Sequence, residues 1–310
     1  MIIRKARKLK PGDKVGVVSP SEPIVFRNKF KSSIRELEEM GLEVVLGENV
    51  FKEYRGYSAG TVEERIKDLN TMIKDRQVKA IFTSLGGFTS NQLLPLINYS
   101  AIRKNPKIII GYSDISVLLN AIYVKTKLIT FHGPTLEFGI PHWKKFTRDH
   151  FEKALFESGP IGKIKAFKVL KSGKATGRLI GGNLSVLRTL WGTKFSPKWR
   201  DTIFFWEDEN ITFEDLEHFL AHLKLVGALE KMRGMVIGKL KNIYKFKSKR
   251  RKANTVEQII LEATKNYNFP IIMNVDFGHF PKQITIPIGA KATIDTSKNL
   301  FSIDEAGVVD

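Results

Sequence analysis

The chain has 310 residues, of which 42% are hydrophobic and 27% are charged, a composition typical of one large or two ordinary globular domains rather than of a disordered chain. It contains no cysteine, which excludes disulfides, thiolate-bound zinc and a cysteine nucleophile. Its formal net charge of +19 favours anionic partners.

No apolar run approaches the roughly 20 residues that a membrane-spanning helix needs. The apolar segment 15–18, which follows the basic N-terminal residues, is too short for the hydrophobic region of a signal peptide, and no cleavage site accompanies it. The sequence therefore predicts a cytoplasmic protein that does not contact a membrane.

The first half of the sequence alternates between predicted strands and predicted helices. Each short apolar run is followed by a segment with apolar residues at helical spacing. This alternation predicts an α/β domain with a parallel, doubly wound sheet, whose ligands bind at the carboxyl ends of the strands. The predicted strands cover residues 14–18, 42–46, 78–83, 108–110 and 128–131, and the predicted helices include residues 30–40, 61–73, 93–96, 114–121 and 146–156.

Two local patterns mark helix ends in this half. Thr61 and Glu64 have the spacing of a capping box, in which each side chain accepts a hydrogen bond from the other residue's backbone N–H. Gly41 follows the first predicted helix at the position where a left-handed residue commonly ends a helix. The sequence therefore predicts a helix start at Thr61 and a helix end before Gly41.

Small polar residues and glycines follow several of the predicted strands. Ser19 follows the first strand, Gly86 and Gly87 follow the third, Ser113 follows the fourth and His132 follows the fifth. The carboxyl ends of parallel strands meet at one edge of a sheet, so we expect the two serines and the glycine pair to line one crevice. The glycines would let the backbone approach a ligand closely, although a simple tight turn is the alternative.

The segment Gly111-Tyr112-Ser113-Asp114 separates a buried strand from a helix. A sharp turn of this kind lifts a serine clear of the sheet and directs backbone N–H groups at the group that the serine attacks. The Gly-x-Ser-x-Gly form of this elbow is not matched, because Ile115 stands in the last position. Ser113 is therefore either a nucleophile or the N-cap of an ordinary helix.

The pattern changes from about residue 142, and short strand-like segments dominate the second half. They predict a β-rich α+β domain, with a boundary somewhere in 140–165 that we place at residue 155. The predicted domains are thus 1–155 and 156–310. The predicted strands cover residues 164–170, 177–180, 202–206, 235–240, 284–287 and 291–295, and the predicted helices cover residues 186–190, 212–225 and 255–264.

Two positions in the second half are candidates for acid–base chemistry. Glu207 follows a buried apolar strand directly, and a carboxylate in that position can hold a histidine in the required tautomer. The neighbouring Asp208 and Glu209 are expected to face solvent. His279 lies in an aromatic turn. The alternatives are that Glu207 only places charge at the start of a helix and that His279 is structural.

Other motifs support weaker predictions. The turn Gly181-Gly182-Asn183 could accept an anion, but the sequence lacks the glycine-rich fingerprints of nucleotide-binding folds, so no cofactor is predicted. His218 and His222 have the spacing of a metal-binding pair, but no third ligand is evident and no metal site is predicted. The basic run 245–252 could bind phosphates or form a solvated loop; nucleic acid is not predicted as a partner.

Taken together in chain order, these motifs resemble the LD-carboxypeptidase family of serine peptidases, peptidase family S66, which includes the microcin C immunity peptidases. The resemblance covers nearly the whole chain. It is carried by Pro11-Gly12-Asp13, Ser19-Pro20-Ser21, Gly86-Gly87, Asn105-Pro106-Lys107, Gly111-Tyr112-Ser113-Asp114, Phe131-His132-Gly133-Pro134, Gly181-Gly182-Asn183-Leu184, Trp206-Glu207-Asp208, Phe277-Gly278-His279 and Ile286-Pro287-Ile288-Gly289.

The resemblance implies a catalytic triad shared between two domains. Ser113 would be the nucleophile, His279 the base and Glu207 the acid that orients the base. The implied fold is an N-terminal Rossmann-like or flavodoxin-like domain and a C-terminal β-barrel-like domain, with the active site between them, in a cytosolic homodimer. We further predict an oxyanion hole formed by the N–H groups of Gly87 and Asp114, and substrate contacts from Ser19, Gly86, Phe88, His132 and Asn183.

The resemblance leaves two substrates open, both of them small and acidic. The first is a murein tetrapeptide, trimmed to the tripeptide, although Leu85 stands where such carboxypeptidases usually have arginine. The second is an acidic aminoacyl-nucleotide conjugate, because the segment 86–95 is closer to the microcin-immunity branch. Basic residues in the crevice are expected to bind the substrate's carboxylate. A two-domain protein that only binds small anions or nucleic acid is the non-enzymatic alternative.

Overall fold

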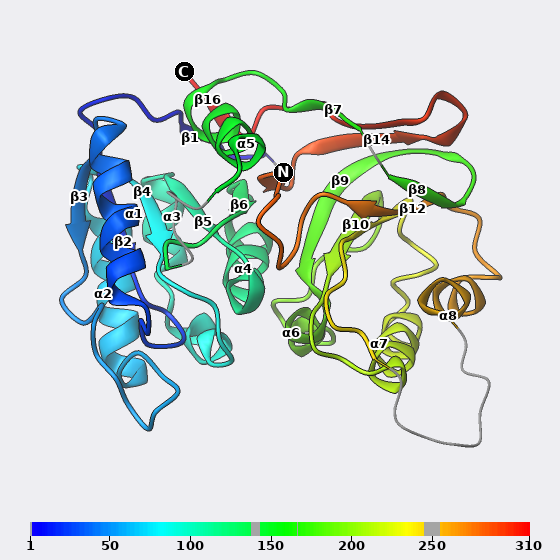
Figure 1. Cartoon of the computed structure of the whole chain (residues 1–310), viewed down its shortest axis with the longest axis horizontal. Helices are drawn as coiled ribbons and strands as arrows, with labels where there is room; N and C mark the ends of the chain where they lie inside the picture. Colours follow the sequence, from blue (N-terminus) through cyan, green and yellow to red (C-terminus); the bar gives the residue numbers. More distant parts are fainter. Residues whose placement is uncertain (1, 138–142, 166, 245–254) are drawn as a thin grey trace.

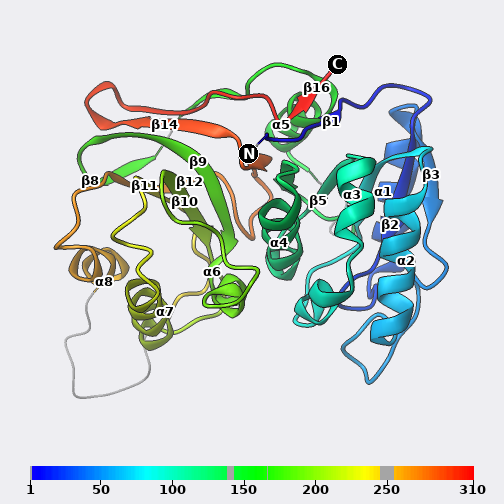
Figure 2. The same cartoon turned by 180° about the vertical axis from the view of Figure 1, so that it is seen from behind.

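The computed structural model describes residues 2–137, 143–165, 167–244 and 255–310. Within these ranges the strands form a six-stranded sheet, an eight-stranded sheet and a two-stranded pair. Figure 1 shows the two large sheets side by side as separate lobes, and Figure 2 shows the same arrangement from behind. Helix α4 (Ser116–Thr126) lies between the lobes in both views and contacts elements of each.

The six-stranded sheet forms the first lobe and has the strand order β13-β6-β5-β4-β2-β3. Its five strands from the first half are mutually parallel, which confirms the predicted parallel sheet. The central strands are buried along their length because helices cover both faces, as their continuous apolar sequence predicts. The strands are β2 (Lys14–Val18), β3 (Glu43–Leu46), β4 (Val78–Thr83), β5 (Ile108–Gly111), β6 (Thr130–His132) and β13 (Ile286–Ile288).

The helices of the first lobe follow the predicted order, with one change of type and with one helix, α3 (Tyr99–Lys104), that was not predicted. Thr61 and Glu64 form both hydrogen bonds of the capping box, and Gly41 has the left-handed φ of +84° expected after a helix end. The segment around Leu93 forms a 3₁₀-helix, which contains Pro95. The helices are α1 (Arg27–Glu39), α2 (Val62–Lys74), η1 (Ser90–Leu96), α3 (Tyr99–Lys104), η2 (Ser113–Ile115), α4 and α5 (Lys145–Phe156).

Lys107 stabilises the junction between α2 and the sheet. Its side chain is only 1% exposed, and its Nζ donates to the carbonyls of Met72, Asp75 and Val78 at 2.7, 2.7 and 3.0 Å. Burial lowers the pKa of Lys107 to about 8. A single cation thus satisfies three carbonyl oxygens where α2 ends and β4 begins.

Replacing Lys107 by methionine is expected to lower the free energy of unfolding by about 3 kcal/mol, because three carbonyls lose a charged donor and two of them are buried with it. Urea denaturation measures this change. Lys79→Met is the control, since Lys79 is exposed and donates to one carbonyl, that of Arg76. Equal losses in the two variants would contradict the assigned role.

The eight-stranded sheet forms the second lobe, with the order β7-β15-β14-β9-β10-β11-β12-β8. It confirms the predicted strand-rich half, and Figure 1 shows β9 arching across the lobe. The single strand predicted over 164–170 is wrong: β7 and β8 lie at opposite edges of the sheet. The strands are β7 (Gly162–Ile164), β8 (Lys168–Lys171), β9 (Lys174–Asn183), β10 (Thr202–Glu207), β11 (Gly234–Gly238), β12 (Ile271–Val275), β14 (Lys291–Asp295) and β15 (Leu300–Ile303).

The helices of this lobe pack beside the sheet, below it in Figure 1. Capping boxes begin α7 at Thr212 and α8 at Thr255, both close to the predicted starts. The remaining helical segments are short. The helices are α6 (Leu184–Leu187), η4 (Arg188–Leu190), α7 (Phe213–Leu225), α8 (Val256–Ala263) and η5 (Thr296–Lys298).

Two strand pairings join the halves of the chain. Strand β13, from the second half, lies antiparallel to β6 in the first sheet. The two-stranded pair joins β1 (Ala6–Arg7) to β16 (Val308–Val309), near both termini in Figure 1. The division at residue 155 stays a prediction. Among the helices of the described ranges, none combines the length and apolar character needed to cross a membrane.

Candidate active site

A cavity of about 400 Å³ is lined by residues that follow strands of the parallel sheet and by residues of the second lobe. Its lining comes from both halves of the chain, as expected for a site between two lobes. A neighbouring cavity of about 430 Å³ shares Tyr112, Glu209 and His279 with it. Six of the site residues predicted from the sequence line the first cavity: Gly86, Gly87, Phe88, Ser113, Asn183 and His279.

Ser113 occupies the turn between β5 and the helical segment η2–α4. Its φ of +59° lies in the left-handed region, which is unusual for a residue with a side chain and is typical of strained functional turns. Tyr112 forms the N-cap position of η2 and Ile115 that of α4. The alternative interpretation of Ser113 as a helix N-cap is therefore wrong, and the turn has the form of an elbow that projects its serine.

Asp114 anchors this elbow rather than lining the cavity. Its buried carboxylate accepts hydrogen bonds from Ser21 Oγ at 2.5 Å and from Ser90 N at 2.9 Å. Ser90 Oγ in turn donates to the Asp114 carbonyl at 2.9 Å. Neither Ser21 nor Ser90 was predicted to contribute to the site, because their contacts with Asp114 span 93 and 24 residues of chain.

Gly86 and Gly87 bring the backbone of the β4 loop against the elbow. A Cβ atom on Gly86 would lie 2.8 Å from Ser113 Cβ and 3.5 Å from Asp114 N. Gly87 has a φ of +138°, which favours glycine, and a Cβ there would lie 2.6 Å from Glu22 Cγ. Gly86 thus lies against Ser113 and Gly87 against the loop of Glu22, while the predicted close approach to a ligand stays a prediction.

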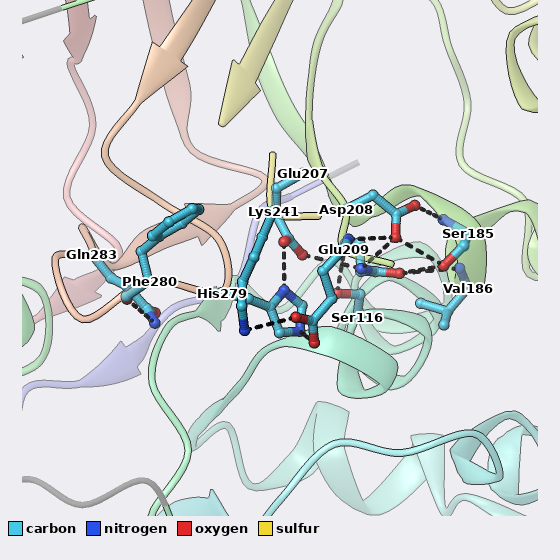
Figure 3. Close-up of polar contacts among 11 residues, drawn as sticks. Ser116, Ser185, Val186, Glu207, Asp208, Glu209, Lys241, His279, Phe280 and Gln283 are labelled. Carbon is cyan, nitrogen blue, oxygen red and sulfur yellow. Dashed lines mark hydrogen bonds and ion pairs between the residues drawn. The ribbon is translucent and has the colours of Figure 1, made fainter. Parts of the chain in front are cut away.

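Glu207, which is buried, and His279, which is partly buried, form a pair on the second lobe. Glu207 is fully buried at the end of β10, and its Oε2 lies 2.7 Å from His279 Nδ1, which donates to it (Figure 3). Asn183 Nδ2 donates to the other carboxylate oxygen at 3.3 Å. The carboxylate is therefore held from two sides, which orients the imidazole.

Each partner shifts the pKa of the other. Burial by itself raises the pKa of Glu207, but the His279 ring and its hydrogen bond outweigh burial and bring the pKa below 4.5. Burial also lowers the pKa of His279, but the charge and hydrogen bond of Glu207, with Glu209 next, bring that pKa above 6.5. A raised pKa is expected of a base that must accept a proton near neutral pH.

The expectation that Asp208 and Glu209 face solvent is wrong for Asp208. Asp208 is 1% exposed, and it accepts hydrogen bonds from the backbone of Ser185 at 2.7 Å and from Asn183 Nδ2 at 3.2 Å. Burial, followed by the charge of Glu207, raises the pKa of Asp208 to about 7. This carboxyl group holds the turn around Asn183 instead of contacting solvent.

Glu209 contacts the His279 ring on the side away from Glu207. Its Oε1 lies 3.2 Å from His279 Nε2 and its Oε2 lies 2.9 Å from Lys241 Nζ. Figure 3 shows the His279 ring between Glu207 and Glu209, with Lys241 reaching the latter. Within the described residues the Ser113 hydroxyl makes no hydrogen bond to His279.

Ser19 and His132 are not among the residues that line the cavity. The Ser19 hydroxyl donates to the Val50 carbonyl at 2.7 Å, so it holds a loop. His132 is 1% exposed, and its ring makes edge contacts with Tyr112 and Phe205. Burial lowers the pKa of His132 to about 4, so its ring is neutral at neutral pH.

The charge of the cavity differs from the sequence-based expectation. Basic residues were expected in the crevice, but among the described residues its lining contains the acidic Glu22, Asp208 and Glu209, the basic His279, and no lysine or arginine. Lys241 lines the neighbouring cavity. The net charge of +19 describes the whole chain, so it did not predict the sign of charge inside a small cavity. The basic run 245–252 lies outside the described residues.

Comparisons with known proteins agree with this architecture. Residues 15–133 match the family model of the LD-carboxypeptidase N-terminal domain, and residues 176–294 match that of the C-terminal domain. A probable murein peptide carboxypeptidase of Bacillus subtilis is 36% identical, over 98% of this chain and 95% of its own length. The microcin C7 self-immunity protein MccF of Escherichia coli is 32% identical, over 97% of this chain and 95% of its own length.

A solved structure of MccF in complex with aspartyl sulfamoyl adenosine has the same fold. It superposes with a TM-score of 0.88 and is 30% identical, covering 98% of this chain and 99% of that one. The likeness therefore extends over both lobes and over the region between them.

Proposed function

The chain belongs to the LD-carboxypeptidase family, and on this premise we propose that it is a serine peptidase that hydrolyses an amide bond of a small peptide, converting murein tetrapeptide to tripeptide. The observation that carries the proposal is the contact of the buried Glu207 with His279, 2.7 Å apart, at the cavity that Ser113 and His279 both line. The name of the B. subtilis relative supports the choice of substrate. The homodimer implied by the resemblance remains a prediction.

In the proposed mechanism, His279 Nε2 accepts the proton of Ser113 Oγ as the oxygen attacks the scissile carbonyl carbon. Glu207 holds Nδ1–H and stabilises the imidazolium. The amine leaves with the proton from His279, which gives an acyl-enzyme. Water, deprotonated by His279, then hydrolyses the ester, so that one water molecule is consumed for each amide bond broken.

The negative oxygen of each tetrahedral intermediate needs donors. We propose the backbone N–H groups of Gly87 and Asp114, which belong to the two turns that meet at Ser113. Removing one such donor typically raises the barrier by about 3 kcal/mol. These donors are backbone groups and cannot be removed by substituting a side chain. A substitution that shifts the turn at Gly86 moves the donors and so tests them indirectly.

Gly86→Ala is expected to lower kcat by about 10- to 100-fold, because the new Cβ would lie 2.8 Å from Ser113 Cβ and 3.0 Å from Ser113 Oγ and must displace the nucleophile. Steady-state kinetics measures the loss. Gly159→Ala is the matched control, since a Cβ at Gly159 meets nothing within 4 Å. An unchanged kcat in Gly86→Ala would show that the turn does not set the position of Ser113.

A second candidate substrate is an acidic aminoacyl-nucleotide conjugate. It is favoured by the 32% identity to MccF and by the likeness to the structure of MccF with aspartyl sulfamoyl adenosine. Mass spectrometry of products after incubation with murein tetrapeptide or with aspartyl sulfamoyl adenosine separates the two candidates. If the protein hydrolyses neither compound, the proposed function is contradicted.

A further inference from the structure

We propose that the active-site cavity selects substrates that carry a cationic ammonium group, which the carboxylates of Glu22 and Glu209 bind. This inference rests on the proposed hydrolase function and narrows its substrate class. It starts from the charge of the cavity, whose described lining contains three acidic residues and no lysine or arginine, in a chain with a net charge of +19. Such a lining attracts a cation.

Asp208 does not contribute to this recognition. Its two oxygens already accept hydrogen bonds from Ser185, Asn183 and the backbone of Glu209. Its pKa of about 7 also leaves it protonated in part at neutral pH. Of the other two acidic residues, Glu22 has a carboxylate without a partner among the described residues, and Glu209 is held by two basic groups, His279 and Lys241, at single contacts of 3.2 and 2.9 Å.

Glu22 lies on the loop that contacts the glycine turn. Its N–H donates to the Gly86 carbonyl at 3.0 Å, and its Cγ lies 2.6 Å from the position of a Cβ on Gly87. Its carboxylate has no hydrogen bond or ion pair to another described residue, and it is partly buried. Burial, together with the charges of Asp114 and Glu137, raises the pKa of Glu22.

An unpaired carboxylate at this place opposes the proposed reaction. The negative oxygen of the tetrahedral intermediate would form beside Gly87, where like charges repel. A substrate ammonium group next to Glu22 removes this repulsion and satisfies the carboxylate. A neutral substrate leaves both the repulsion and the unpaired carboxylate in place.

Glu209 links the arrival of an ammonium group to the catalytic base. In the structure its Oε1 lies 3.2 Å from His279 Nε2, the nitrogen that must accept the proton of Ser113. An ammonium group that binds Oε1 replaces this contact and frees Nε2. The second oxygen keeps its contact with Lys241 at 2.9 Å, which holds the carboxylate in place.

Both candidate substrates satisfy this requirement chemically. Murein tetrapeptide has free amino groups, and aspartyl sulfamoyl adenosine has a free amino group on the carbon next to its aminoacyl carbonyl. On this inference, the cavity does not bind the acidic groups of these compounds. The ammonium group is the feature that they share and that the described lining fits.

The test compares murein tetrapeptide with an analogue in which hydroxyl groups replace its free ammonium groups. The wild type is expected to prefer the natural compound by at least tenfold in kcat/KM. Glu22→Gln and Glu209→Gln should each reduce this preference severalfold. Glu53→Gln, which alters an exposed acidic residue outside the cavity lining, should keep it. Glu209→Gln should also move the acid limb of the pH profile to lower pH.

Equal kcat/KM values for the two compounds in the wild type would overturn the inference, as would a preference that survives both cavity substitutions. Isothermal calorimetry measures the affinity of the Ser113→Ala protein for each compound, and so tests the inference separately from the proposed hydrolysis. If neither compound is hydrolysed, tighter binding of the ammonium compound still supports the inference, and equal binding refutes it. Thermal unfolding of each variant checks that the glutamine substitutions leave the fold intact.

Discussion

Ser113→Ala is expected to lower kcat/KM for the preferred substrate by at least about 10⁴-fold, because the variant has no oxygen with which to form the acyl-enzyme. The fold should persist, since the Ser113 hydroxyl makes no hydrogen bond within the described structure and the anchors of the turn belong to Asp114. Quantified product release, followed to long incubation times, measures the loss.

The matched control for this substitution is Ser100→Ala, which removes an exposed hydroxyl from α3. It should keep full activity. A phosphonofluoridate reagent should label the wild type once and leave Ser113→Ala unlabelled. Turnover that survives Ser113→Ala at a wild-type rate would refute the mechanism, because another group would then have to act as the nucleophile.

Glu207→Gln is expected to lower kcat by about 10³- to 10⁴-fold while keeping the shape of the side chain. Glutamine cannot stabilise the imidazolium, and its amide can hold the ring in the wrong tautomer. The effect is large because Glu207 is fully buried and no water can replace its contact with His279 Nδ1. Pre-steady-state kinetics should locate the loss in acylation.

The same substitution should change the pH profile in a defined direction. His279 acts as a base only when neutral, so kcat/KM rises with pH through the pKa of the free enzyme. That pKa lies above 6.5 in the wild type, mainly because of Glu207. Removing the carboxylate lowers the pKa, so the acid limb should move to lower pH while the maximum falls.

Glu217→Gln is the control for charge, since Glu217 is exposed on α7 and lies outside the site. It should leave both the maximum and the acid limb unchanged. An acid limb that stays in place in Glu207→Gln would show that another group governs the profile. The partly exposed Glu209, which also contacts His279, would then be the next residue to test.

Much of the first lobe follows from local sequence. The strands Lys14–Val18 and Val78–Thr83 coincide with their predicted ranges, because an apolar run that is buried on both faces and bounded by turns has few other ways to fold. The capping box at Thr61 forms for a local reason too, since both of its hydrogen bonds lie within one turn of helix.

The second lobe was harder to predict because its order depends on long-range pairing. The segment 164–170 reads as one strand, yet its two ends pair with β15 and β12, at opposite edges of the sheet. Strands β12 and β15 were missed altogether. Strand propensity depends on the strands that pack beside a segment. The sequence of a short segment therefore says little about its position in the sheet or about the strands with which it pairs.

The sequence by itself determined that Ser113 stands in a strand-to-helix turn, because the backbone of a few adjacent residues decides that geometry. The resemblance in motifs added Glu207 and His279, which are 72 residues apart, to the predicted site. Only the tertiary structure decided that Asp208 is buried, that Glu209 faces His279 and that the cavity is acidic within a basic chain. Burial and local charge depend on which distant segments the fold brings together, and neither is a property of a residue's neighbours in sequence.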